Sequence, residues 1–101
     1  MKLHALAAAR QELDDALTYY GNIHPDLAEA LFSEIIRSRN LILQFPFAWM
    51  NMGRGLRGFV VTGYPYTIVY QIRKDDIWVV AYAHHKRRPG YWRERLKQIP
   101  K

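Results

Sequence analysis

The chain has 101 residues, 50% of them apolar, with a formal charge of +6 at neutral pH and no cysteine. A chain of this length is expected to fold as one domain with its own core. The lack of cysteine excludes disulfides, thiolate nucleophiles and cysteine-ligated zinc, and it favours a reducing compartment, the cytoplasm. The longest apolar run, 77–83, is far shorter than the roughly 20 residues that a membrane-spanning helix requires.

The N-terminal half predicts two helices joined as a hairpin. Residues 2–6 alternate weakly, as in a short strand. Apolar residues recur at steps of three and four over 7–20, and Gly21 predicts the end of that helix. Pro25 predicts the start of a second helix, whose apolar stripe continues until Pro46. Because each helix has one apolar stripe, the hairpin needs a second layer to cover it.

The C-terminal half predicts that second layer. A glycine-rich turn at 51–58 leads into a strand at about 56–63. Residues 66–73 alternate between apolar and polar, which predicts a half-buried strand, and a polar turn joins it to an interior strand at 77–83. Residues 91–99 form either a short helix or a tail. The predicted fold is therefore α+β, in the order β-α-α-β-β-β, with the helical hairpin packed on a small antiparallel β-sheet.

The charge is divided unevenly along the chain. Residues 1–50 carry four cations and six acids, a sum of −2, whereas residues 51–101 carry eleven cations and three acids, a sum of +8. This asymmetry predicts one positive face, which attracts either phosphate or an acidic protein segment. A solvated basic surface with no partner is the alternative interpretation.

The densest cluster of functional side chains lies in residues 84–97, which contain several arginines and lysines together with two histidines and two aromatic residues. Arginine pairs with phosphate, tyrosine and tryptophan stack on bases or anchor a protein partner, and histidine exchanges a proton near neutral pH. This mixture suits nucleic acid and an acidic peptide almost equally. In the alternative interpretation, Tyr91 and Trp92 fix the tail on the sheet and the arginines face water.

The sequence predicts no metal site and no cofactor. His84 and His85 are neighbours on a predicted strand, so their side chains point to opposite faces and do not share one ion. The glycines around Gly53 match no phosphate-binding spacing. A ribonuclease would need a proton acceptor, a proton donor and cations for the phosphate. The candidates for these roles are Arg57, His84, Lys86, Arg87 and Tyr91.

Two motifs carry a resemblance to a known family. The stretch 65–70 reads PYTIVY, and His84 begins the pattern H-x-x-R-x-P-x-Y-W-x-x-R about fifteen residues later. With further matches over 7–20, 27–35 and 81–95, the chain resembles the RelE/ParE superfamily of toxins from bacterial type II toxin–antitoxin systems, which includes plasmid-stabilisation proteins. The resemblance implies a helical hairpin packed on a small antiparallel sheet, as the residue pattern also predicts.

The resemblance implies one of two activities. RelE-like members are ribosome-dependent mRNA endonucleases whose motif needs two lysines and an arginine on the strands, where this chain has Gly58, Val60 and Thr67. Arg87 and, approximately, Tyr91 do match that motif. ParE-like members inhibit DNA gyrase by binding, and the two motifs fit that branch better. We therefore expect a ParE-like gyrase inhibitor rather than a nuclease. A member of altered activity and a non-toxic nucleic-acid-binding module are the remaining hypotheses.

Both branches imply a cognate antitoxin and a toxin–antitoxin hetero-oligomer, in which an acidic or amphipathic segment of the antitoxin wraps the toxin. The side chains expected to contact the cellular target are Arg87, Arg88, Tyr91, Trp92 and Arg95. Those expected to contact the antitoxin are Arg57, Arg73 and Lys86.

Overall fold

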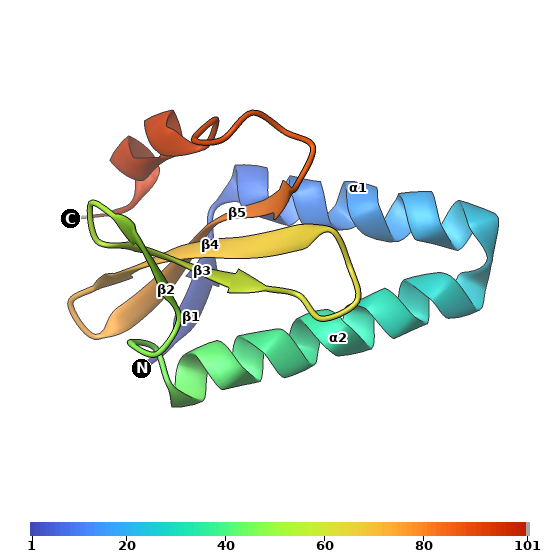
Figure 1. The fold of residues 1–101 in the computed structure, drawn as a ribbon, viewed down its shortest axis with the longest axis horizontal. Helices are drawn as coiled ribbons and strands as arrows, with labels where there is room; N and C mark the ends of the chain where they lie inside the picture. The colour runs from blue at the N-terminus through green and yellow to red at the C-terminus, as the bar shows by residue number, and fades with distance from the viewer. Residues whose placement is uncertain (101) are drawn as a thin grey trace.

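A computed structural model describes residues 1–100, which form two helices, five strands and a C-terminal 3₁₀ helix. In chain order the elements are β1 (Leu3–Ala5), α1 (Ala7–Ile23), α2 (Pro25–Gln44), β2 (Met50–Gly53), β3 (Leu56–Val60), β4 (Tyr66–Arg73), β5 (Asp76–His84) and η1 (Arg93–Gln98). The sheet has the strand order β1-β5-β4-β3-β2. The two helices form a hairpin that packs on the sheet and extends beyond its end, while the C-terminal segment crosses the sheet at the opposite end of the molecule (Figure 1).

The predicted α+β class, with a helical hairpin on a small sheet, is confirmed, but the sheet differs from the prediction in two ways. It is mixed, because β1 pairs with β5 in parallel, and only the remaining pairs are antiparallel. It also contains β2, in the region where the glycines predicted a turn. The turn itself is shorter and centres on Arg54 and Gly55, whose φ angles are 55° and 75°. Gly58 lies inside β3, where an added Cβ would come within 2.7 Å of Met52 Sδ.

The helical hairpin also departs from the prediction at one point, since α1 continues past Gly21 to Ile23. Gly21 instead allows close packing of the two helices, because a Cβ there would lie 3.4 Å from the Ala28 Cβ. The extended backbone of His24 ends α1, and its ring accepts a hydrogen bond of 3.1 Å from the Asp26 amide. Pro25 then occupies the first turn of α2, as predicted.

The sheet is covered on both faces. One buried cluster joins the helices to β3, β4 and β5 and includes Leu31, Ile35, Ile68 and Tyr70. A second cluster lies on the other face and includes Leu56, Val69, Val80, Trp92 and Ile99. The prediction that β4 is half-buried is therefore wrong at Val69, which packs with Trp92 and Ile99, whereas Thr67, Gln71 and Arg73 on the same face remain partly exposed.

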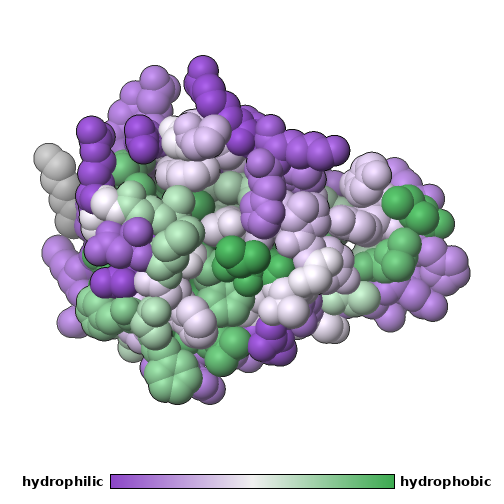
Figure 2. Space-filling view, viewed as in Figure 1, coloured by the Kyte–Doolittle hydropathy of each residue, from purple (hydrophilic) through white to green (hydrophobic). Residues whose placement is uncertain are grey.

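The surface seen in Figure 2 has distinct polar and apolar regions. Hydrophilic side chains gather over the C-terminal segment at the top, and apolar surface gathers over β2, β3 and the C-terminal end of α2. The large apolar side chains exposed in that region include Phe45, Phe47, Met50 and Val60. Within residues 1–100, neither helix combines the length and the apolar character needed to cross a membrane.

Candidate functional site: the C-terminal cluster around Glu12

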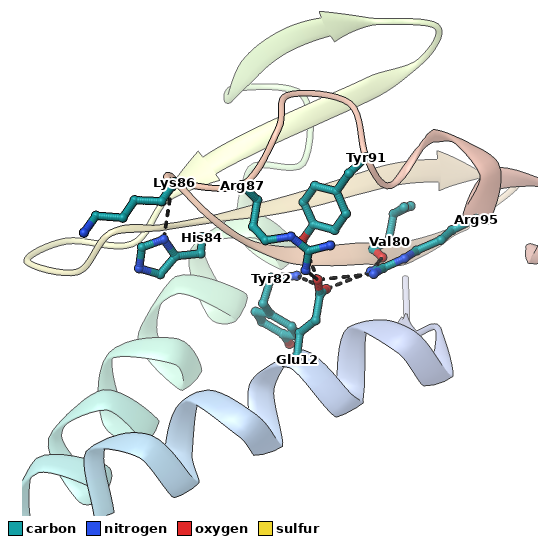
Figure 3. Close-up of polar contacts among 8 residues, drawn as sticks. All are labelled: Glu12, Val80, Tyr82, His84, Lys86, Arg87, Tyr91 and Arg95. Carbon is teal, nitrogen blue, oxygen red and sulfur yellow. Dashed lines mark hydrogen bonds and ion pairs between the residues drawn. The ribbon is translucent and has the colours of Figure 1, made fainter. Parts of the chain in front are cut away.

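Arg87, Tyr91 and Arg95 of the C-terminal segment gather around the carboxylate of Glu12 on α1 and form the C-terminal cluster (Figure 3). The Glu12 side chain is only 15% exposed and accepts hydrogen bonds from Arg95 Nη1 at 2.7 Å, Arg95 Nη2 at 3.2 Å and the Tyr82 amide at 3.2 Å. The Tyr91 hydroxyl donates a further hydrogen bond to the same carboxylate. Arg95 also donates to the Val80 carbonyl at 3.1 Å. One acid thus ties the C-terminal segment to both α1 and β5.

Local turns bring these side chains together after β5 ends. The Arg87 amide donates to the His84 carbonyl at 3.0 Å, and the Lys86 amide donates to the His84 ring at 3.0 Å. Pro89 and Gly90 follow, and Gly90 has a φ of 79°, a conformation that glycine adopts readily. The chain thereby reverses over the sheet and presents Tyr91 to α1.

Arg87 is the cation of this cluster that remains open to solvent. Its side chain is 55% exposed, and its guanidinium lies 3.8 Å from the centroid of the Tyr91 ring and 3.7 Å from a Glu12 oxygen. Cation–π contact and the ion pair fix the orientation of the guanidinium without burying it. Burial and then the Glu12 carboxylate raise the pKa of Tyr91 far above its usual value. Tyr91 therefore stays protonated and acts here as a hydrogen-bond donor rather than as a proton carrier.

A groove of about 290 Å³ opens beside this cluster, between α1 and the end of β5. It is lined in part by Asp15, Tyr19, Tyr66, His84 and Arg87. The His84 ring packs edge-to-face on Tyr66 at 5.1 Å between centroids. Aromatic, imidazole and guanidinium groups thus meet in one open cleft.

The two histidines diverge, as predicted from their adjacency. His84 contacts Tyr66, whereas His85 Nε2 lies 2.9 Å from the hydroxyl of Thr67, which is the next residue of β4 and points to the other face. Across residues 1–100, no group of three or more histidines or acids is placed to hold a metal ion.

The side chains expected to contact the target have different environments. Arg87, Tyr91 and Arg95 come together at Glu12, and Arg88 is exposed in the turn. Trp92 is only 8% exposed and packs in the second buried cluster, so it holds the segment on the sheet. The interpretation in which the aromatic pair fixes the tail is thus correct for Trp92 and, through the hydrogen bond to Glu12, for Tyr91. It is wrong for Arg95, which is largely buried and does not face water.

Glu12 itself was not predicted as a site residue, although the sequence contains a signal for it. It lies three residues after Ala9 and four before Ala16, both of which are buried on the inner face of α1. An acid on the apolar face of a helix needs a buried partner, because an unpaired charge there is costly. This rule predicts that Glu12 has a buried cationic partner, but it does not identify that partner as Arg95.

The three cations expected to contact the antitoxin lie on separate elements. Arg57 of β3 donates to the Trp49 carbonyl at 2.9 Å. Arg73, at the end of β4, donates to the Gln71 side chain at 3.0 Å. Lys86 is exposed in the turn after β5. Arg57 pairs with Tyr70 on the helix-facing side of β3 and β4, so the structure does not bring it to His84, Arg87 and Tyr91 as a nuclease would require.

The positions of the RelE-like cations do come together on the face of the sheet away from the helices. Val60 pairs directly with Thr67, and a Cβ on Gly58 would lie 3.1 Å from the Thr67 methyl group. The methionines Met50 and Met52 flank Gly58. The strands therefore present methionine, valine and threonine side chains where a nuclease of that type has cations. The positive charge beside them comes from the turn after β5, because His85 and Arg87 line the same pocket as Met50, Met52 and Thr67.

Comparisons with known proteins agree with this geometry. A solved structure described as the "Chromosomal ParDE TA system from P. aeruginosa" is similar to this chain with a TM-score of 0.66 and 14% identity, over 83% of this chain and 95% of that one, which shows a shared fold. No curated protein matches the sequence. Residues 5–89 match the family model of the ParE toxin of the type II toxin–antitoxin system parDE. The match covers most of the chain, and the chain therefore belongs to the ParE family of type II toxins.

Proposed function

We propose that this protein arrests growth by binding DNA gyrase in the cytoplasm, that it does not cleave RNA, and that a cognate antitoxin neutralises it. The observation that carries the proposal is the lack of a cation at Gly58, Val60 and Thr67, three positions that meet on one face of the sheet. RNA cleavage requires cations that stabilise the charge developing on the phosphate, and each missing group costs a few kcal/mol of transition-state stabilisation.

The remaining groups of the nuclease pattern are also poorly suited to catalysis. The Tyr91 hydroxyl is held by Glu12, and burial raises the pKa of Tyr91, so it is a weak proton donor to a leaving group. Arg87 is oriented by the same carboxylate and by the Tyr91 ring. An exposed guanidinium of fixed orientation is well suited to binding a carboxylate on a protein partner.

The target surface that we propose centres on Arg87 and Arg88, which are exposed in the turn after β5. Glu12, Tyr91 and Arg95 hold this turn in place from beneath. The antitoxin is attracted by the positive charge of the C-terminal half, which carries +8 against −2 in the N-terminal half. The two proteins form a hetero-oligomer in this account.

Conditional expression in bacteria tests the proposal. The protein alone should stop growth, and co-expression of the adjacent reading frame should restore it. The Arg87→Ala variant should lose toxicity, whereas Lys97→Ala, which removes an exposed cation from the same segment, should remain toxic. Growth unaffected by wild-type expression would overturn the proposed function.

A further inference from the structure

Four large apolar side chains are exposed over β2, β3 and the C-terminal end of α2. They are Phe45, Phe47, Met50 and Val60, with exposed fractions between 55% and 66%, and together they are called the β2 patch. The apolar surface in Figure 2 gathers in the same region. Single exposed apolar side chains need no explanation, whereas a patch of several marks an interaction site.

Two hollows adjoin the β2 patch, and Met50 lines both of them. The larger, of about 440 Å³, is lined in part by Leu41 and Trp49. The smaller, of about 150 Å³, extends to the turn after β5, where Arg87 lines it. The patch is therefore continuous with the exposed turn that carries Arg87 and Arg88.

The surroundings of the β2 patch are positively charged. The stretch between Glu34 and Asp75, which includes β2, β3 and β4, contains no acid. Arg37 of the larger hollow is paired with Glu34. Arg57 is partly exposed, lies 5.6 Å from the centroid of the Phe47 ring and makes no ion pair within residues 1–100. A partner that covers the patch therefore meets cations, and carboxylates on that partner would pair with them.

This charge decides between the possible occupants of the patch. A second copy of the chain would bring a further charge of +6 and would place like charges opposite Arg54 and Arg57. An acidic partner meets no such repulsion. The patch also continues into the turn of Arg87 and Arg88, which is the proposed contact with the target, and this continuity favours the target over the antitoxin.

We propose that the β2 patch is a second part of the surface that binds DNA gyrase, and that it accepts a gyrase segment with apolar side chains flanked by carboxylates. This inference rests on the proposed function, because gyrase is the target in that account. An apolar side chain of gyrase occupies the hollow beside Met50, and the carboxylates pair with Arg57 and Arg87. Apolar anchors within a charged rim are typical of protein interfaces, and a methionine side chain adapts its shape to the group that it contacts.

Methionine oxidation by dilute peroxide, followed by mass spectrometry, tests whether gyrase covers the patch. Met1 and Met50 are equally exposed, at 55% and 56%, so they should oxidise at similar rates in the free protein. With gyrase in excess, the oxidation of Met50 should slow about tenfold or more, because its side chain is then covered. Met1 is the internal control and should oxidise as it does in the free protein.

A substitution at the same residue gives an independent test. Met50→Glu should weaken gyrase inhibition about tenfold or more, since it places a carboxylate where an acidic partner docks. The matched control is Ile23→Glu, which replaces an equally exposed apolar residue at the end of α1 and should inhibit as the wild type does. Thermal unfolding checks that both variants fold. If Met50→Glu does not fold, the oxidation of the wild type still decides the question.

The outcomes separate this inference from the proposed function. If the wild type neither binds nor inhibits gyrase, both fail. If it inhibits gyrase while Met50 stays open to oxidation, or if Met50→Glu inhibits as the wild type does, only the β2 patch is wrong. Protection of Met50 by the protein of the adjacent reading frame but not by gyrase would assign the patch to the antitoxin and overturn the inference. Protection that grows with the concentration of the free protein would assign it to a second copy and would overturn the inference as well.

Discussion

Glu12 Oε1 lies 2.7 Å from Arg95 Nη1, although the two residues are 83 positions apart in the sequence. Both side chains are mostly buried, with 15% and 17% of their surfaces exposed. The pair connects the first helix to the C-terminal 3₁₀ helix, and both residues also bond the backbone of β5, at Tyr82 and Val80. Because Tyr91 and Arg87 share the same carboxylate, the shape of the solvent-exposed turn depends on this one contact.

Replacing Glu12 should therefore destabilise the protein strongly. Glu12→Ala leaves Arg95 buried without its partner, and we expect the free energy of unfolding to fall by about 3 kcal/mol. Urea unfolding followed by circular dichroism measures this change. Asp15→Ala, an exposed acid on the same helix, is the matched control and should change stability by less than about 0.5 kcal/mol. Equal effects of the two substitutions would show that the Glu12 cluster contributes nothing specific.

Trp92 should tolerate loss of its N–H but not loss of its ring. Its Nε1 atom is buried with no hydrogen-bond partner, so Trp92→Phe breaks no bond and should cost about 1 kcal/mol through reduced packing. Trp92→Ala removes the whole side chain from the second cluster and should cost about 3 kcal/mol or more. Thermal unfolding distinguishes the two. If Trp92→Phe lost as much stability as Trp92→Ala, Trp92 Nε1 would have to make a hydrogen bond, which would contradict this account of the residue.

The sequence predicted those features of the fold that depend on local pattern. The start of α2 at Pro25 and the extent of β4 were predicted correctly, because turn residues and alternation act over a few positions. The strand β2 was missed because glycines favour turns, while Gly58 is present to make room for methionine side chains. Arg95 could not be predicted as the partner of Glu12, because the two residues are 83 positions apart and only the packing of the folded chain brings them together.

Stability at acid pH should depend on Asp76. Hydrogen bonds from His4 and then from the Lys2 amide hold the pKa of this carboxyl below its ordinary value of 3.8. A lowered pKa in the folded state contributes stability that is present above the unfolded pKa and is lost as the pH falls through the folded pKa. The stability that the wild type has over Asp76→Asn should be present above the ordinary pKa of 3.8 and should shrink as the pH falls below it.

Urea titrations at a series of pH values measure that difference. Asp75→Asn is the control, because Asp75 is exposed and makes no ion pair within residues 1–100. A difference that grows as the pH falls would contradict the role given to Asp76.

Arg87 and Tyr91 should both be needed for toxicity, but for different reasons. Arg87 is exposed, so Arg87→Ala should abolish growth arrest while costing less than about 1 kcal/mol of stability. Tyr91→Phe loses a hydrogen bond to a carboxylate and should lose about 2 kcal/mol as well as toxicity. Growth assays measure the toxicity of each variant and unfolding curves measure its stability, so together they separate loss of target contact from loss of folding. A fully toxic Arg87→Ala variant would show that the exposed turn does not contact the target.

The most direct test of the account is an assay of the purified protein with its two possible targets. One reaction contains DNA gyrase and plasmid, and the other contains ribosomes programmed with mRNA. We expect the wild type to inhibit gyrase and to leave the mRNA intact, and we expect Arg87→Ala to affect neither gyrase nor mRNA. Cleaved mRNA with unaffected gyrase would contradict the central claim, because the protein would then cleave RNA without cations at Gly58, Val60 and Thr67.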